Sequence, residues 1–329
     1  MPMLTLRQAE DLVVAALMRA RTSEDNARSV ARALVMAEAD GLKGHGLSRV
    51  PMYAAQARNG KVDGQANPAL TQRRPALVAV DAANGFAYPA IELAETVLPG
   101  LARSQGIAAA AIHRSHHCGA AGHPVERLAE AGLVAILFVN TPAGIAPWGG
   151  SRAVLGTNPV AFACPLPDRA PLVIDLSLSK VARGNIMTAK QRGEKIPEGW
   201  ALDAHGQPTA DPDAALAGTM LPMGDAKGTA LALMVELLAA GLTGANFAAD
   251  ASSFLDDKGP PPGTGQLIVA FDPAAFGGDA VARFAVLARS IEAQPGARLP
   301  GAKRLAARAK AKADGLTISD ALMREIEAI

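Results

Sequence analysis

The stretch that decides the fold runs from Ile107 to Val139 and reads IAAAAIHRSHHCGAAGHPVERLAEAGLVAILFV. Its first six residues are apolar and mostly small, which favours a buried strand, and a polar loop containing glycine follows them. Pro124–Ala131 then has helical periodicity, and Val134–Val139 is typical of a second buried strand. Strand, loop, helix and strand in this order predict a mixed α/β protein.

The same alternation continues on both sides of this stretch. Further strands are expected over Ala76–Asp81, Val160–Cys164, Leu172–Leu176 and Gln266–Phe271, and further helices over Pro89–Ser104 and Lys227–Leu242. The apolar segment Thr229–Ala249 carries Glu236 and Asn246 and is interrupted by two glycines. We therefore interpret it as a buried helix and not as a membrane span.

Both ends of the chain are expected to be helical. Thr22 and Asp25 have the spacing of a capping box before a helix that ends at Gly41, and a later helix over Leu47–Arg58 places Arg49 and Tyr53 on one face. The C-terminal helices are expected over Asp279–Ala293, Ala302–Ala313 and Ser319–Ala328. We predict a discontinuous helical domain, residues 1–70 with 279–329. Residues 71–278 then form a mixed α/β region that binds cofactor and substrate, with an inserted subdomain as an option.

Composition excludes several function classes. The 32 basic and 31 acidic residues leave a net charge of +1, so the chain has no overall field that attracts nucleic acid or anionic lipid. The two cysteines, Cys118 and Cys164, lie in no C-x-x-C pattern, and the N-terminus does not resemble a signal peptide. We expect a cytoplasmic protein that binds neither nucleic acid nor membrane.

Familiar catalytic and phosphate-binding motifs are missing. The sequence contains no G-x-G-x-x-G after a strand and no G-x-x-x-x-G-K-[ST]. It also lacks the G-x-S-x-G of α/β-hydrolases and the H-E-x-x-H of zinc proteases. A nucleotide site in this chain therefore needs a less common construction.

Four of the six histidines lie between His113 and His123. A metal site is disfavoured there, because no carboxylate and no second thiol stands nearby. A polar loop with helix-capping histidines is one alternative. We favour a strand-to-helix loop whose glycines expose backbone N–H groups to a phosphate at a helix N-terminus.

A second candidate site is the run Gly44-His45-Gly46-Leu47-Ser48-Arg49. The flanking glycines leave the imidazole of His45 accessible, and the guanidinium of Arg49 can bind a carboxylate through two hydrogen bonds. One group that moves a proton and one that holds an acid suit a 2-hydroxy-acid dehydrogenase. The alternative is a glycine-rich turn with a solvated histidine. A third segment, Leu221–Gly228, combines a turn with Lys227 at a helix start and suits a phosphate.

In order, these segments resemble the malate/L-lactate/sulfolactate dehydrogenase family over nearly the whole chain. That family also contains Δ1-pyrroline- and Δ1-piperideine-2-carboxylate (cyclic ketimine) reductases and ureidoglycolate dehydrogenases. The motifs are GHGLSRVPMYAAQARNGKVDG, HHCGAAGH, APWGG, GTNPVAFA, VIDLSLSKVARG, MLPMGDAKG, ALALMVELLAAGLTGA and RLPG. The resemblance implies a fold distinct from the Rossmann type, NAD or NADP as cofactor, and a homodimer with its active site in a cleft between domains.

The resemblance also implies roles for single residues. His45 resembles the family's proton donor and acceptor and Arg49 its carboxylate clamp, although some members give the proton role to the histidine that matches His117. Substrate contacts are expected from Thr157, Asp175, Leu176 and Ser177. Cofactor contacts are expected from His117, Cys118, Gly119, Ala120, Ala121, Arg183, Gly184, Gly224, Asp225, Lys227 and Gly228.

Three positions depart from the family pattern. The ketimine reductases have Ser where this chain has Gly44 and Asp where it has Asn185. Serine and aspartate together can orient and stabilise a charged imidazole, so their absence favours a hydroxy acid over an imine as substrate. Asp225 replaces a common glycine, and its charge near the expected phosphates favours NAD over NADP.

Overall fold

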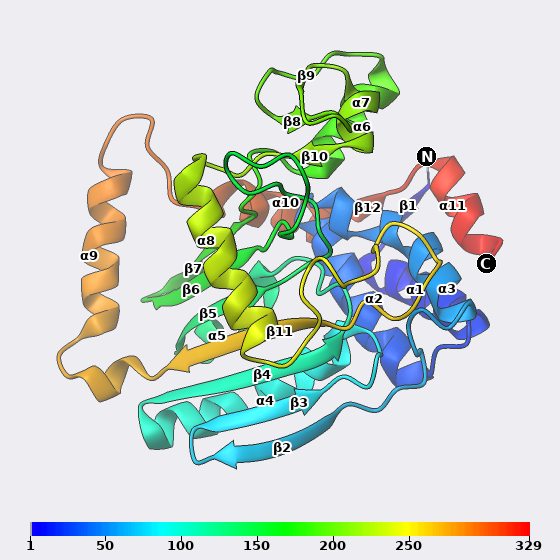
Figure 1. Cartoon of the computed structure of the whole chain (residues 1–329). Helices are drawn as coiled ribbons and strands as arrows, with labels where there is room; N and C mark the ends of the chain where they lie inside the picture. Colours follow the sequence, from blue (N-terminus) through cyan, green and yellow to red (C-terminus); the bar gives the residue numbers. More distant parts are fainter. Residues whose placement is uncertain (1) are drawn as a thin grey trace.

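The computed structural model describes residues 2–329, and its centre is a seven-stranded mixed sheet (Figure 1). Only β3 and β4 run parallel, and every other neighbouring pair in this sheet is antiparallel. In spatial order the strands are β2 (Ala69–Arg74), β3 (Leu77–Asp81), β4 (Ile107–Ser115), β11 (Thr264–Phe271), β5 (Val134–Val139), β6 (Val160–Leu166) and β7 (Arg169–Leu176). The six strands expected from the sequence are present. The edge strand β2 was missed because its residues are mostly exposed and polar.

Helices cover both faces of the sheet, with α8 in front and α4 behind in Figure 1. The rear face packs on α4 (Ala87–Gln105) and α5 (Gly122–Glu130) through a core rich in alanine. Ala108, Ala110 and Ile112 alternate with less buried neighbours along β4, as expected of a strand with one covered face. Residues 116–121, which link β4 to α5, are all buried.

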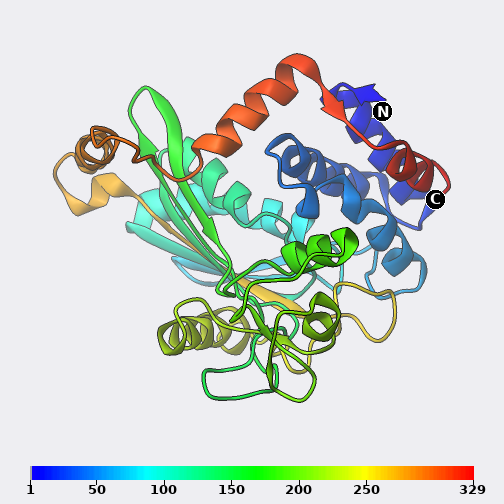
Figure 2. The ribbon, with the colours of Figure 1, turned by 90° about the horizontal axis from the view of Figure 1, so that it is seen from above.

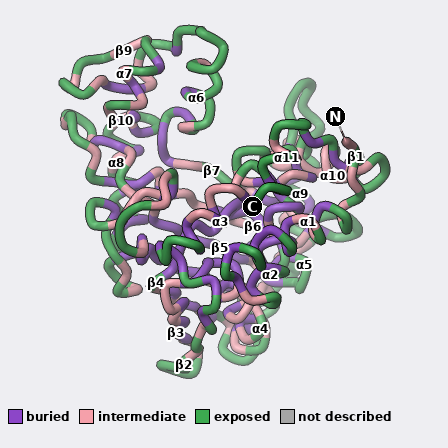
Figure 3. Tube along the Cα trace, turned by 90° about the vertical axis from the view of Figure 1, so that its right-hand side faces the viewer, coloured by how far each residue is buried: buried purple, intermediate pink, exposed green. Residues whose placement is uncertain are grey.

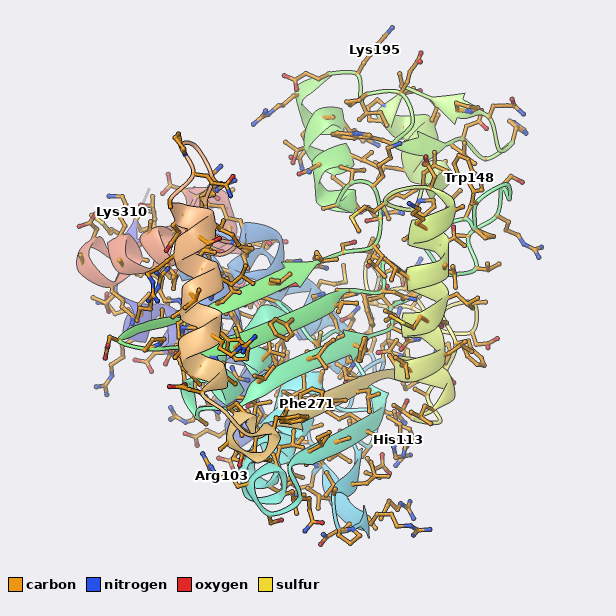
Figure 4. The ribbon with its side chains drawn as sticks, turned by 90° about the vertical axis from the view of Figure 1, so that its left-hand side faces the viewer. Arg103, His113, Trp148, Lys195, Phe271 and Lys310 are labelled. Carbon is orange, nitrogen blue, oxygen red and sulfur yellow. The ribbon has the colours of Figure 1, made fainter. Side chains whose placement is uncertain are left out.

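The front face packs on α8 (Ala226–Glu236), which continues into a π-helical turn, η3 (Leu237–Gly241). The expected helix over Lys227–Leu242 is present, but it is buried on one face only and not all round. Leu233 and Leu237 are 48% and 54% exposed, and Trp148 lies near the start of this helix, where its backbone N–H donates to Thr229 Oγ1 (Figure 4). The sequence pattern predicts the helix, but it does not show which of its apolar side chains the rest of the chain leaves exposed. No helix within residues 2–329 is long and apolar enough to cross a membrane.

The two ends of the chain pack together beside the sheet (Figure 2). The helices there are α1 (Leu6–Arg19), α2 (Glu24–Ala39), α3 (Val50–Arg58), α10 (Ala302–Asp314) and α11 (Asp320–Glu327), with 3₁₀ helices η1 (Lys43–His45) and η2 (Leu47–Arg49) before α3. Strands β1 (Met3–Leu4) and β12 (Leu316–Thr317) join the termini. Ser23, and not Thr22, caps α2, because its Oγ accepts the N–H of Asn26.

A buried ionic cluster joins α10 to α2 and α5. Asp40, after α2, and Glu126, in α5, each bind both Arg304 and Arg308 at distances between 2.6 and 3.2 Å. Burial opposes ionisation of the two carboxyls, but hydrogen bonds from the arginines prevail and lower the pKa of both. His123 Nε2 lies 2.9 Å from Asp40 Oδ2 and completes the cluster.

Two parts of the chain lie outside these layers. Helix α9 (Ala280–Glu292) follows η4 (Pro273–Phe276) and packs against β6, so the C-terminal helices do not all lie with the N-terminal ones. The domain division at residue 279 stays a prediction. A small, largely exposed unit stands at one end, with Lys195 at its tip (Figures 3 and 4). It comprises α6 (Arg183–Arg192), β8 (Ala201–Leu202), β9 (Pro208–Thr209), α7 (Pro212–Ala217) and β10 (Thr219–Met220).

Candidate active site

The turn after α2 presents His45 and Arg49 from η1 and η2. Glu38 anchors this turn, since its Oε2 accepts the N–H of Leu47 at 3.0 Å, and a side chain at Gly46 would collide with that carboxylate. Burial raises the pKa of Glu38, and the hydrogen bond from Leu47 opposes that rise. The glycine at 46 is therefore needed for close packing.

His117, in the loop after β4, meets His45 across the site. Their rings are stacked with centroids 5.4 Å apart and an angle of 13° between planes. The hydroxyl of Tyr53 lies 2.6 Å from His117 Nδ1 and 3.0 Å from the hydroxyl of Tyr88. The helix expected over Leu47–Arg58 begins at Val50, one residue after Arg49, and both Arg49 and Tyr53 lie close enough to His117 to affect it electrostatically or by hydrogen bonding.

Both stacked imidazoles are neutral at pH 7. Burial lowers the pKa of His45 to about 4, with a smaller contribution from the charge of Arg49. Burial and then Arg49 lower the pKa of His117 well below its usual range. Burial also raises the pKa of Tyr53 to about 12, so its hydroxyl keeps its proton. A fixed partner on Nδ1 determines the imidazole tautomer. His117 has such a partner, whereas the Nδ1 of His45 is buried without one.

Arg49 is a cation without an acidic partner. Its Nε donates to the carbonyl oxygen of Gly44 at 2.7 Å, and within residues 2–329 no carboxylate lies in ion-pair distance of its guanidinium. A charged group beside two neutral rings attracts an anion, and a carboxylate matches its planar hydrogen-bond donors.

Residues 248–263 form a loop that packs against the histidines, a contact that the sequence analysis did not predict. The ring of Phe254 lies 5.3 Å from that of His117. The buried ammonium of Lys61 holds this loop by its 2.7 Å bond to Asp256 Oδ1, and the same bond lowers the pKa of Asp256. No local pattern in the sequence predicted this anchor.

The residues expected to contact substrate form two groups: Asp175 contacts the backbone next to the loop of His117, and Thr157 and Ser177 contact each other. Asp175 Oδ2 accepts the N–H of Gly122 at 2.7 Å, directly after residues 117–121, and burial raises the pKa of Asp175. The N–H of Thr157 donates to Thr141 Oγ1, and Ser177 Oγ donates to the carbonyl of Thr157 at 3.3 Å. Leu176 ends β7 and is 37% exposed. In this structure the carboxylate of Asp175 therefore binds the backbone at the end of that loop.

The expected phosphate residues form a second group at the start of α8. Gly224 and Asp225 have φ of +66° and +59°, and Gly228 has no room for a side chain beside the carbonyl of Met223. The carboxylate of Asp225 has a cationic partner, because the Nζ of Lys180 lies 3.8 Å from its Oδ1. The first-turn amides of a helix attract phosphate, and Lys227 stands in this turn. Its donors and its cation are of the kind that a phosphate needs.

The remaining expected contacts lie at the start of α6. Arg183 Nη2 donates to the carbonyl of Leu216 at 3.0 Å, while Gly184 and Asn185 are exposed. Within residues 2–329 no hydrogen bond joins Asn185 to His45. The other loop, His117 to Ala121, is buried throughout; its Cys118 thiol is free, Gly119 has a φ of +69°, and Ala120 lies next to it. The described residues hold no group of three or more side chains suited to a metal.

These features can be compared with known proteins. Residues 4–327 match the family model described as malate/L-lactate dehydrogenase. The chain therefore belongs to this family, and the predicted class, an NAD(P)-dependent dehydrogenase, is confirmed. A curated relative, the (2R)-3-sulfolactate dehydrogenase (NADP(+)) of Chromohalobacter salexigens, is 53% identical over 99% of this chain and 97% of its own length.

Solved structures confirm the predicted non-Rossmann fold. The Δ1-piperideine-2-carboxylate reductase of Pseudomonas syringae pv. tomato has a TM-score of 0.95 and 38% identity, covering 100% of this chain and 99% of its own. The sulfolactate dehydrogenase of Methanocaldococcus jannaschii has a TM-score of 0.91 and 28% identity, covering 99% and 96%. One fold thus carries both substrate classes that the sequence left open.

Proposed function

We propose that this protein interconverts 3-sulfopyruvate and 3-sulfolactate with NADP(H), or a closely related pair of small 2-oxo and 2-hydroxy acids. The observation that carries the reaction class is the unopposed guanidinium of Arg49 beside two neutral imidazoles, His45 and His117. The 53% identity with a sulfolactate dehydrogenase supports the choice of acid.

Each group has one task in this reaction. Arg49 binds the substrate carboxylate and brings the carbonyl carbon to the two rings. Reduction needs one proton at the carbonyl oxygen, and we assign its delivery to His117, because Tyr53 orients this ring and nothing orients that of His45. His45 packs on His117 and keeps water away from it. The nicotinamide cofactor supplies the hydride, with its phosphates at the start of α8 and its ring near residues 117–121.

We propose NADP as the preferred cofactor, in contrast to the expectation from Asp225. That expectation assumed an unopposed carboxylate near the 2′-phosphate. Lys180 lies 3.8 Å from Asp225 and offsets its charge, and Lys227 adds a cation two residues along the chain. The relative with 53% identity is itself NADP-dependent.

A substrate panel tests the proposal. The absorbance of NADPH and NADH is followed with sulfopyruvate, oxaloacetate, pyruvate and the two cyclic imines. We expect sulfopyruvate with NADPH to give the highest kcat/KM. A higher value for either imine would contradict the proposed substrate class, and a higher value with NADH would contradict only the proposed cofactor.

The second candidate, a cyclic ketimine reductase, is favoured by the structural likeness to the P. syringae enzyme. An imine must hold a positive charge during reduction, and an anionic group near the ring nitrogen stabilises it. This chain has Gly44 and Asn185 at the two positions concerned, and a side chain at Gly44 would meet no atom within 4 Å. Serine can therefore be introduced at position 44 without strain.

We expect the double variant Gly44→Ser with Asn185→Asp to raise the ratio of imine to oxo-acid kcat/KM by about tenfold, equivalent to ~1.4 kcal/mol. Each single change should do less, because the two groups act as a unit. The measurement is kcat/KM for Δ1-piperideine-2-carboxylate and sulfopyruvate in all four proteins. An unchanged ratio in the double variant would show that these positions do not set the substrate class.

We propose that the protein is a cytoplasmic homodimer. Its free buried cysteines suit a reducing compartment. The exposed apolar face of α8 and the start of η3, formed by Leu233, Met234 and Leu237, supports a dimer, because monomers seldom expose neighbouring large apolar side chains. We propose this face as the contact between two copies.

Replacing Leu237 by glutamate should convert dimer to monomer, because two carboxylates would be buried at a symmetric contact. Sedimentation equilibrium of the variant and of wild type measures this. Val286→Glu on α9 changes another exposed apolar position and is expected to leave the dimer intact. Dissociation by the α9 variant alone would place the contact at α9 instead.

A further inference from the structure

The chain's two tyrosines lie in line behind the active site. Tyr53 comes from α3 and Tyr88 from α4, and their hydroxyls are 3.0 Å apart. The hydroxyl of Tyr53 also reaches His117 Nδ1 at 2.6 Å, so one group links the imidazole to a second phenol. Burial raises the pKa of both tyrosines, and each therefore remains a hydroxyl that can donate one proton and accept another.

The line ends at a cavity that Tyr88 borders together with residues of the 117–121 loop. The hydroxyl of Tyr88 lies against Gly119, where an added side-chain carbon would come within 2.6 Å of it. Tyr88, Cys118 and Ala120 line a cavity of about 190 Å³ between α2, α4 and α5. The rim of this cavity carries charged groups, among them Arg32 and Glu92, and its volume accommodates several waters.

We propose that Tyr53 and Tyr88 form a proton relay that connects His117 to solvent in this second cavity. The relay rests on the proposed function for its direction, and it adds two positioning residues that touch neither substrate nor cofactor. The relay explains how the buried ring of His117 can donate a proton without becoming charged. Burial disfavours the imidazolium form of His117, so the ring starts neutral, and loss of its Nε2 proton would leave a buried imidazolate unless Nδ1 gains a proton at the same time.

Proton and charge balance through this line. During reduction the carbonyl carbon receives a hydride from NADPH, and the carbonyl oxygen takes the proton of His117 Nε2. Nδ1 takes the proton of Tyr53, Tyr53 takes that of Tyr88, and Tyr88 takes one from water in the cavity. One solvent proton is consumed for each oxo acid reduced, and every group of the relay ends neutral. After the product leaves, Nε2 takes a proton from water in the opened site and the relay passes the Nδ1 proton back through Tyr53 and Tyr88 to the cavity, which restores the starting tautomer. Oxidation of the hydroxy acid follows the same path in reverse.

The first test needs neither substrate nor cofactor. ¹⁵N-labelled histidine in the free protein reports the tautomer of each ring, and the His117→Asn variant identifies the His117 signals. We expect the Nε2–H tautomer at pH 7, because Tyr53 donates to Nδ1. Tyr53→Phe should abolish this preference, and Tyr88→Phe should shift the Nδ1 signal without abolishing it. An Nδ1–H tautomer in wild type would overturn the relay.

The second test is kinetic. Tyr88→Phe keeps the ring and removes the hydroxyl, and we expect kcat to fall roughly tenfold, KM to stay within about twofold, and the solvent deuterium isotope effect on kcat to rise. Small proton donors such as imidazole should restore part of kcat. Met36→Leu alters the lining of the same cavity and should change none of these values.

The two tests separate failure of the relay from failure of the proposed function. An active Tyr88→Phe protein with unchanged kcat and isotope effect would overturn the relay alone. If no 2-oxo acid is reduced by wild type, the proposed function is wrong, and the tautomer measurement still decides whether Tyr53 donates to His117.

Discussion

Replacing His117 by alanine should lower kcat by about 10²–10⁴-fold, which is the usual cost of losing a general acid and base. The ring is buried, neutral and hydrogen-bonded through Nδ1 to Tyr53, so no neighbouring group can take over its proton without a charge penalty. Steady-state kcat with sulfopyruvate and NADPH measures the loss. Binding of NADPH to the free protein, followed by fluorescence, separates this loss from weaker cofactor binding.

His45→Ala is the matched comparison, because it removes the other ring of the same stack. We expect a smaller loss in kcat, since the Nδ1 of His45 has no partner that orients it. The opposite pattern, with the larger loss at His45 and mainly weaker NADPH binding at His117, would support the assignment that the sequence favoured. The proton would then be carried by His45.

Arg49→Lys should raise KM for the oxo acid and lower kcat/KM by about 30- to 700-fold, equivalent to about 2–4 kcal/mol. A lysine ammonium keeps the charge but cannot form the two parallel hydrogen bonds that a guanidinium makes with a carboxylate. Arg49 has no acidic partner in the free protein, so the substitution breaks no internal ion pair and its effect can be attributed to substrate binding.

Arg28→Lys is the control for this change. Arg28 is an exposed arginine of α2 whose partner is Glu24, and the same substitution there should leave kcat/KM unchanged. Near-normal kcat/KM in Arg49→Lys would remove Arg49 from the substrate site and, with it, the observation on which the proposed reaction class depends.

The sequence predicted the large elements well, because each repeats its pattern over many residues. Strand β5 was predicted at its observed bounds, Val134–Val139, since a short unbroken apolar run after a glycine turn is typical of a buried strand. The two-residue strands of the small unit, such as β8, contain no period and were missed. The cap of α2 was placed at Thr22 because Thr22 and Asp25 have the spacing of a capping box, and only the backbone geometry shows that Ser23 is the cap.

The site was predictable where its residues are near neighbours. Arg49 and Tyr53 are four residues apart, so helical geometry alone placed them together. The stack of His45 on His117 depends on how the first helices dock on the sheet, and no local pattern encodes that. One unused signal was available: the chain has only two tyrosines, and both lie in segments that border the site.

The ionic cluster of Asp40, Glu126 and the two arginines of α10 has a consequence for biosynthesis. Asp40 precedes the turn that carries His45, and Glu126 follows the loop that carries His117, so α10 clamps both halves of the site to one point. Breaking a buried pair of this kind costs about 3–5 kcal/mol. During translation the two halves emerge long before α10 does. The nascent chain therefore lacks this clamp until α10 has left the ribosome, and we expect the two halves of the proposed site to be held together only after that point.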